Sequence, residues 1–157
     1  MLTESLNLTV ERRSQSHTLI QELVDTRTEM LSLFSQLVEM KPFQADQETC
    51  DLLQEFCETL VDYTLQAHLN LYRHIEEKLE KRKQVLQLAD EIYPRILSTT
   101  EIISDFNDKY EEINEQLDAT KLEEHLSTLG EALAVRIELE DQLIEVLTRR
   151  VRSVETV

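Results

Sequence analysis

Residues 47–72 decide the fold of this chain, and they read QETCDLLQEFCETLVDYTLQAHLNLY. Their apolar side chains recur every three or four residues, which is the spacing of one face of an α-helix, and the stretch contains no Gly or Pro. The stripe comprises Leu53, Phe56, Cys57, Leu60, Ala67, His68, Leu71, Ile75 and Leu79. The pattern predicts a long helix from about Gln47 to Lys81, capped by Asp46 or a neighbour.

Three further segments show the same helical periodicity. The first runs from about Thr9 to Glu39 and ends ahead of Pro42, because a residue that precedes proline is pushed out of helical geometry. Another runs from about Gln84 to Leu117 and contains Pro94, where we expect a kink or a break. The last runs from about Lys121 to Arg152.

Four amphipathic segments with short links fold most simply as one antiparallel four-helix bundle. The composition agrees, because one Gly and two Pro in 157 residues leave little from which to build β-hairpin turns. Gly130 lies inside the last helix, where it predicts close packing against another helix. The expected fold is therefore all-α, a single bundle domain over residues 1–157 with long helices, the third kinked or broken near Pro94.

The charge of the chain limits its partners. There are 32 acidic against 16 basic residues, a formal net charge of −16, so the chain should repel phosphate backbones and anionic lipid and attract a basic protein. No apolar run approaches the 18 or so residues that would suggest a membrane span, and the N-terminus lacks an apolar signal segment. We expect a cytoplasmic protein that binds neither nucleic acid nor membrane directly.

The sequence offers little chemistry for catalysis. A ferritin-like di-metal site needs Glu-x-x-His, in which a Glu precedes the His by three residues. The residues three before the four histidines are Ser14, Leu65, Leu71 and Leu122. There is also no Gly-x-Ser-x-Gly and no Gly-rich phosphate loop. We expect no metal, no cofactor and no enzymatic activity, and a metal-binding bundle enzyme is the disfavoured alternative.

Two rows of acidic residues stand out instead. Glu48, Asp51, Glu55, Glu58 and Asp62 follow one another at helical spacing, and residues 43–72 contain no Lys or Arg. A second row comprises Glu101, Asp105, Asp108, Glu112 and Glu115. Like charges at these spacings cost a helix about 0.2–0.5 kcal/mol per pair. The rows are either solvated faces of the bundle or a docking surface for a cationic partner.

Charged residues also fall in phase with the apolar stripes. Arg27 lies between Leu23 and Met30, and Arg136 and Glu140 interrupt the stripe of the last helix. Such residues are seldom buried unless they are paired. We predict that these residues form an internal or groove-lining network, with His68 as a candidate member. The network serves either to fix the register of the helices or to bind a ligand.

Several stretches resemble one protein family over nearly the whole chain. The run Phe56-Cys57-Glu-Thr-Leu60-Val61-Asp62-Tyr63, followed by Ala67-His68 and Tyr72, resembles the second-helix signature of the Rsd/AlgQ family, and Leu129-Gly130-Glu131-Ala132-Leu133, Arg136 and Leu139-Glu140-Asp141 resemble its last-helix signature. Supporting matches are Asn7-Leu8-Thr9, Leu37-Val38, Lys41-Pro42 and Ile92-Tyr93-Pro94. Two positions depart from the family pattern: Leu23, where relatives carry an aromatic residue, and Ala67, where they carry Gly.

The resemblance implies an anti-sigma factor that binds the C-terminal region 4 of the housekeeping sigma factor, a basic helix-turn-helix. Binding would keep that region from core RNA polymerase and from the promoter −35 element, as expected in stationary phase. The implied contact residues centre on Asp62, with Asp51, Glu55, Glu58, Tyr63, His68 and Tyr72 around it. Some relatives bind the histidine-containing phosphocarrier protein, so the alternative is an adaptor for that protein or another regulator.

Overall fold

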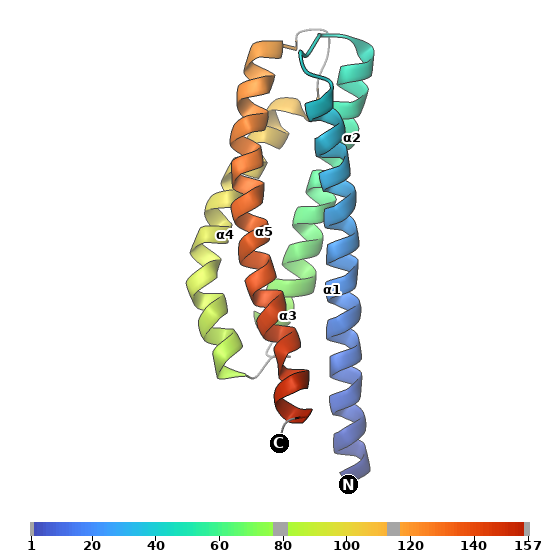
Figure 1. The fold of residues 1–157 in the computed structure, drawn as a ribbon, viewed down its shortest axis with the longest axis vertical. Coiled ribbons are helices and arrows are strands. Elements are labelled where there is room, and N and C mark those ends of the chain that lie inside the picture. The colour runs from blue at the N-terminus through green and yellow to red at the C-terminus, as the bar shows by residue number, and fades with distance from the viewer. Residues whose placement is uncertain (1, 77–81, 113–116, 156–157) are drawn as a thin grey trace.

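The computed structural model describes residues 2–76, 82–112 and 117–155 (Figure 1). Its elements are α1 (Leu2–Glu39), α2 (Gln47–Ala67), the π-helical turn η1 (His68–Tyr72), α3 (Arg73–Glu76), α4 (Lys83–Tyr110) and α5 (Ala119–Glu155). Within these ranges every regular element is a helix and there is no strand, which confirms the predicted all-α fold class.

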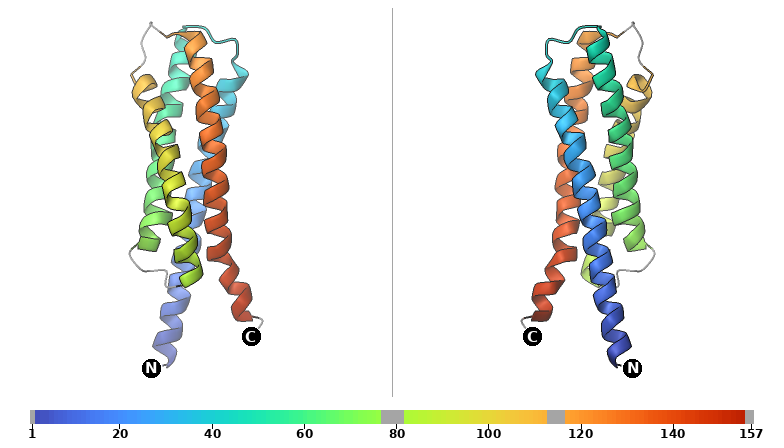
Figure 2. Two further views of the ribbon diagram at one scale, coloured as in Figure 1. Left: turned by 90° about the vertical axis from the view of Figure 1, so that its left-hand side faces the viewer. Right: turned by 90° about the vertical axis from the view of Figure 1, so that its right-hand side faces the viewer.

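The helices form four long rods that lie side by side. One rod consists of α2, η1 and α3, which follow one another without a gap. Consecutive rods run in opposite directions, and the start of α1 and the end of α5 lie at the same end of the molecule (Figures 1 and 2). Contacts are extensive between α1 and α2 and between α4 and α5, whereas α2 and α4 meet over a shorter length. The bundle is therefore two tight helix pairs that meet along looser seams, one of which lies between α2 and α4.

Local sequence explains where the second rod begins. The Asp46 carboxylate accepts a hydrogen bond of 2.8 Å from the backbone N–H of Thr49, so it caps α2 as predicted. Hydrogen bonds from the Thr49 side chain and from this backbone N–H lower the pKa of Asp46. The described part of the rod ends at Glu76, and residues 77–81 of the predicted helix lie outside the described residues.

The third rod differs from the prediction at two points. Helix α4 continues without interruption through Pro94, so no break occurs there, and a kink stays a prediction. Proline removes the hydrogen bond to the carbonyl of residue 90, but Pro94 and Asp90 are both exposed, so solvent can satisfy that carbonyl. The helix also ends at Tyr110 rather than near Leu117, which is not helical.

The interior is filled by Leu and Ile side chains around a row of aromatic rings. Phe34 and Phe106 each pack against Phe56 with ring centroids 5.9 Å apart, and Phe106 continues the row to Tyr110 at 4.7 Å. At Gly130 an added Cβ atom would lie 3.0 Å from Cζ of Phe34. The Phe34 ring of α1 therefore packs directly against Gly130 of α5, whereas a close approach of the two helix backbones at this point stays a prediction.

One polar contact lies where α4 ends. Tyr110 Oη lies 2.5 Å from Nδ1 of the half-buried His125 on α5, and the two rings meet edge to face. Burial lowers the pKa of His125, and the nearby positive charge of Lys109 lowers it further. The imidazole therefore favours its neutral form, in which Nδ1 can accept a hydrogen bond from the tyrosine hydroxyl.

None of the helices, over the residues that the structure describes, is both long and apolar enough to span a bilayer.

Candidate functional site

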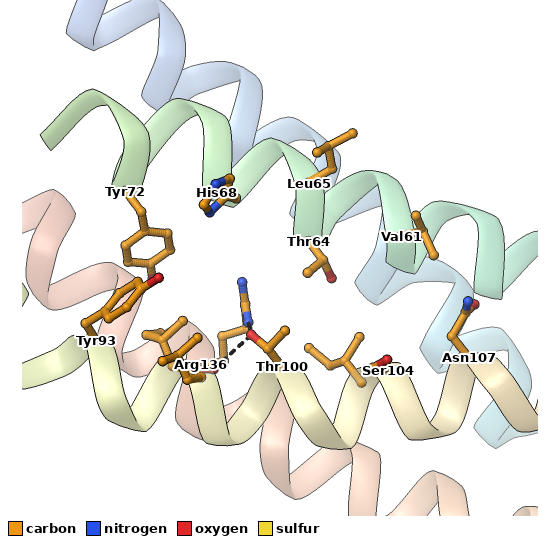
Figure 3. Close-up of a pocket in the computed structure, with 13 residues that line it drawn as sticks. Val61, Thr64, Leu65, His68, Tyr72, Tyr93, Thr100, Ser104, Asn107 and Arg136 are labelled. Carbon is orange, nitrogen blue, oxygen red and sulfur yellow. Dashed lines mark hydrogen bonds between the residues drawn. The ribbon is translucent and has the colours of Figure 1, made fainter. Parts of the chain in front are cut away.

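A groove follows the loose seam between α2 and α4. It has a volume of about 490 Å³. One wall comes from α2 and η1, the other from α4, and Arg136 of α5 points into the space between them (Figure 3). Thr64, Thr100 and Ser104 face the groove and are too small to fill it, which explains why the space stays open.

The rim of the groove is apolar and exposed. Val61 and Leu65 on α2 are 43% and 55% exposed, and Leu97 on α4 is 46% exposed. Apolar side chains of this size usually contribute about 1.5–3 kcal/mol when they become fully buried. A rim that leaves them in water is thus suited to contact with a partner.

Tyrosine rings close one end of the groove. Tyr72 of η1 packs edge-on against Tyr93 of α4, with ring centroids 6.1 Å apart, and both line the groove (Figure 3). A π-helical turn holds more residues than an α-helical one, so η1 changes the direction of the side chains that follow it. Tyr72 is only 4% exposed, and its hydroxyl has no hydrogen-bond partner among the described residues.

Beneath the groove lies a buried polar network. Glu140 is its centre: Oε1 accepts a 2.5 Å hydrogen bond from Tyr63 Oη, and Oε2 accepts one of 3.2 Å from Arg136 Nε. Arg136 Nη1 donates to the hydroxyls of Thr99 and Thr100, at 3.3 Å and 2.8 Å. These bonds join α2, α4 and α5.

Arg27 connects the network to α1. Its Nη1 atom lies 3.6 Å from Glu140 Oε1 and 2.9 Å from Asp141 Oδ1, in ion pairs that lack hydrogen-bond alignment. The structure therefore brings together the three residues that the sequence placed in phase with the core, Arg27, Arg136 and Glu140. His68, the candidate fourth member, lies on the groove wall instead.

Burial controls the protonation of this network. It raises the pKa of Glu140, while the Arg136 guanidinium and the Tyr63 hydrogen bond oppose that rise. Burial also raises the pKa of Tyr63, and the Glu140 charge adds to that effect. Tyr63 therefore keeps its proton and acts as a donor to Glu140.

Members of both acidic rows lie beside the groove, which begins at Val61 on α2. All five members of the first row, Glu48, Asp51, Glu55, Glu58 and Asp62, are exposed on α2. Residues three or four apart on a helix are neighbours, so Glu58 lies beside Val61 and Asp62 beside Leu65. On α4, Glu101, Asp105 and Asp108 are exposed, as is Glu112 just beyond its end, while Glu115 lies outside the described residues. Leu97 and Glu101 are neighbours in the same way.

Two predicted contact residues, Tyr63 and Tyr72, are buried rather than exposed, and Tyr72 lines the closed end of the groove. Tyr63 was predicted as an anchor for the partner, but its side chain is fully buried and bonded to Glu140. The reason is its phase, since Tyr63 lies on the α2 face that also carries the buried residues Phe56 and Leu60. Asp62 and His68 are exposed beside the groove, as a contact role requires.

Sequence reasoning missed the apolar rim and two members of the network. Leu65 and Val61 fall outside the core stripe of α2. Their position on another face of the helix could have indicated an exposed apolar edge. Thr99 and Thr100 carried no such signal, because their role depends on where Arg136 of another helix reaches. Among the described residues no cluster of His, Cys, Asp and Glu could hold a metal ion.

Comparisons with known proteins agree on one family. The family model described as regulator of RNA polymerase sigma(70) subunit, Rsd/AlgQ, matches residues 1–148. A protein of Salmonella newport named regulator of sigma D is 35% identical over 147 residues, which are 92% of this chain and 90% of that protein. One of Yersinia enterocolitica with the same name is 32% identical over 149 residues, 92% of this chain and 89% of that protein. No solved structure significantly matches this chain. By its sequence, this chain belongs to the Rsd/AlgQ family of regulators of the RNA polymerase sigma(70) subunit.

Proposed function

We propose that this protein is an anti-sigma factor. It binds region 4 of the housekeeping sigma factor along the groove between α2 and α4 and keeps that region from core RNA polymerase and from the −35 element. It acts in the bacterial cytoplasm, by binding rather than by catalysis, and needs no cofactor. The observation that carries the proposal is an exposed apolar rim with exposed members of both acidic rows beside it.

The groove suits a basic amphipathic helix. Recognition of this kind places the apolar face of the helix in a hydrophobic groove, here against Val61, Leu65 and Leu97. Lysine and arginine side chains on the flanks of the helix then reach Glu58 and Asp62 on one side and Glu101 and Asp105 on the other. Region 4 is a basic helix-turn-helix, so covering it in this way also hides the surface that reads DNA.

The apolar rim and the acidic rows contribute differently. An exposed ion pair is worth only about 0–1 kcal/mol, so most of the affinity comes from burying the rim. The acidic rows increase the association rate and reject acidic partners. With a net charge of −16, the chain attracts a basic domain over a distance that salt shortens.

The test is a titration of the intact protein with isolated sigma region 4, followed by fluorescence anisotropy across a salt series. We expect the affinity to fall steadily as salt rises from about 50 mM to about 300 mM, because the screening length shrinks. Asp62→Lys should weaken binding by about tenfold or more, since it replaces an attraction by a repulsion. Circular dichroism should show unchanged helicity.

Glu29→Lys is the matched control. Glu29 is exposed on α1, which forms no wall of the groove, and the variant makes the same change in charge. It should bind nearly as well as the unmodified protein. Equal binding by all three proteins would refute the assigned surface. The histidine-containing phosphocarrier protein is added as a competitor, and a higher affinity for it than for region 4 would favour the adaptor function instead.

A further inference from the structure

The closed end of the groove holds hydrogen-bond donors that no described residue uses. Arg136 has five N–H groups, and its partners among the described residues engage Nε and Nη1 only: Glu140 at Nε, and Thr99 and Thr100 at Nη1. The two N–H groups of Nη2 make no hydrogen bond to a described residue, although Arg136 is only 2% exposed and points into the groove (Figure 3).

Tyr72 supplies a further unused donor at the same end. Its hydroxyl is buried without a partner among the described residues. Burial raises its pKa, the Glu140 charge raises it further and the Arg136 charge opposes the rise, so the hydroxyl keeps its proton beside the guanidinium. A buried donor left unpaired is costly and rare in native proteins. The matching ligand is therefore an acceptor.

The charge balance beneath the groove favours an anionic acceptor. Two guanidinium groups, Arg27 and Arg136, surround the single buried carboxylate of Glu140. Asp141 pairs with Arg27 at 2.9 Å, so the positive charge that faces the groove is that of Arg136. Hydrogen bonds from a guanidinium group to an anion are stronger than those to a neutral acceptor.

The surrounding walls limit the ligand to a small apolar acid. The cavity of about 490 Å³ is in the range of small-molecule sites, about 300–1,000 Å³. Val61, Leu65, Ile96 and Leu97 contribute apolar surface to it. The protein is strongly acidic and its rim carries carboxylates, so a dianion such as phosphate is repelled about twice as strongly as a monoanion.

We propose that the end of the groove closed by Tyr72 and Tyr93 is a binding site for a small monocarboxylate with an apolar body. The carboxylate accepts hydrogen bonds from Arg136 Nη2 and from the Tyr72 hydroxyl, and the apolar body lies against the walls formed by α2 and α4. The site shares Val61, Leu65 and Leu97 with the proposed docking surface, so an occupied site alters how a protein partner docks. The binding itself does not depend on the identity of that partner.

The test uses the intact protein without any partner. Hexanoate and benzoate are the probes, and hexanamide and benzamide are their uncharged controls, each titrated at millimolar concentrations while amide resonances are followed by NMR. We expect both carboxylates to shift the resonances of groove residues saturably and the amides to shift them far less. No saturable shift, or equal shifts from acid and amide, would overturn the proposal.

Tyr72→Phe tests the assigned donor without threatening the fold, because the hydroxyl it removes is unpaired. It should weaken carboxylate binding by about tenfold, as expected for losing one hydrogen bond to a charged group. Tyr110→Phe is the matched control, since it removes a hydroxyl that His125 engages outside the groove, and its carboxylate affinity should be unchanged. Unchanged affinity in Tyr72→Phe would also overturn the assignment.

Discussion

Tyr63 Oη donates a hydrogen bond of 2.5 Å to Glu140 Oε1, which ties α2 to α5 across the interior of the bundle. The two residues are 77 positions apart in sequence. The Arg136 guanidinium lies over the Tyr63 ring, 5.6 Å from its centroid, and bonds the other oxygen of Glu140. A carboxylate held in this way fixes the relative register of two helices, because sliding either helix would leave a charge buried without partners.

Glu140→Gln should strongly destabilise the protein. The variant keeps the shape of the side chain but leaves Arg27 and Arg136 without their buried counter-ion. Breaking a buried ion pair typically costs about 3–5 kcal/mol, and urea unfolding followed by circular dichroism measures the loss. Glu138→Gln, an exposed site on the same helix, should change the free energy of unfolding by no more than about 0.5 kcal/mol. Similar losses in both variants would contradict a central role for Glu140.

Tyr63→Phe should destabilise the protein, whereas Tyr72→Phe should not. The first removes a bonded donor and leaves Glu140 with one partner fewer, at a cost of about 1.5–3 kcal/mol for a hydrogen bond to a charged group. The second removes a hydroxyl that is buried without a partner among the described residues, so the free energy of unfolding should stay equal or rise. Urea unfolding of the two variants side by side checks this, and a larger loss in Tyr72→Phe would show the assignment of partners to be wrong.

Gly130→Leu should destabilise the contact between α1 and α5. Leucine is the better helix former, by up to about 1 kcal/mol, but its Cβ atom would come within 3.0 Å of the Phe34 ring. Overpacking of this kind costs about 1–3 kcal/mol, so the net effect on thermal unfolding should be a loss. In a Phe34→Ala background, Gly130→Leu should leave the stability unchanged or increase it. If the variant is still destabilised there, the steric clash does not involve the Phe34 ring.

His125 should make stability depend on pH. Its pKa is lower in the folded protein than the ordinary value of 6.5, so the unfolded chain binds the proton more readily. The contribution of neutral His125 is therefore complete above pH 6.5 and is lost as pH falls from there toward the lower folded pKa. Acidification also relieves repulsion among the many carboxylates, so the effect must be measured as a difference from His125→Gln. Between about pH 7.5 and about pH 5.5, the free energy of unfolding should fall more in the unmodified protein than in His125→Gln. Equal falls in the two proteins would contradict the prediction.

Local sequence was sufficient for the elements that depend on near neighbours. Apolar spacing predicted the helices, Asp46 was a predicted cap, and Gly130 indicated a contact with another helix. These features involve residues within one or two turns, or a single residue whose missing side chain is itself the signal. The acidic rows were predictable for the same reason, since residues three and four apart must share a helix face. Arg136 and Glu140 also lie in phase with the apolar stripe of the last helix, which predicted that charged side chains are buried in the core.

Only the tertiary structure determines which surroundings each helix face has. Whether Val61 and Leu65 are covered depends on how far α4 lies from α2, and that spacing is set by side chains on all four rods. The burial of Tyr63, the unpaired hydroxyl of Tyr72 and the joining of Arg136 to Thr99 and Thr100 depend on contacts between residues distant in sequence. The continuity of α4 through Pro94 depends on that face being open to solvent. Periodicity assigns a residue to a helix face, but only the packing of the rods determines whether that face borders the core, a groove or water.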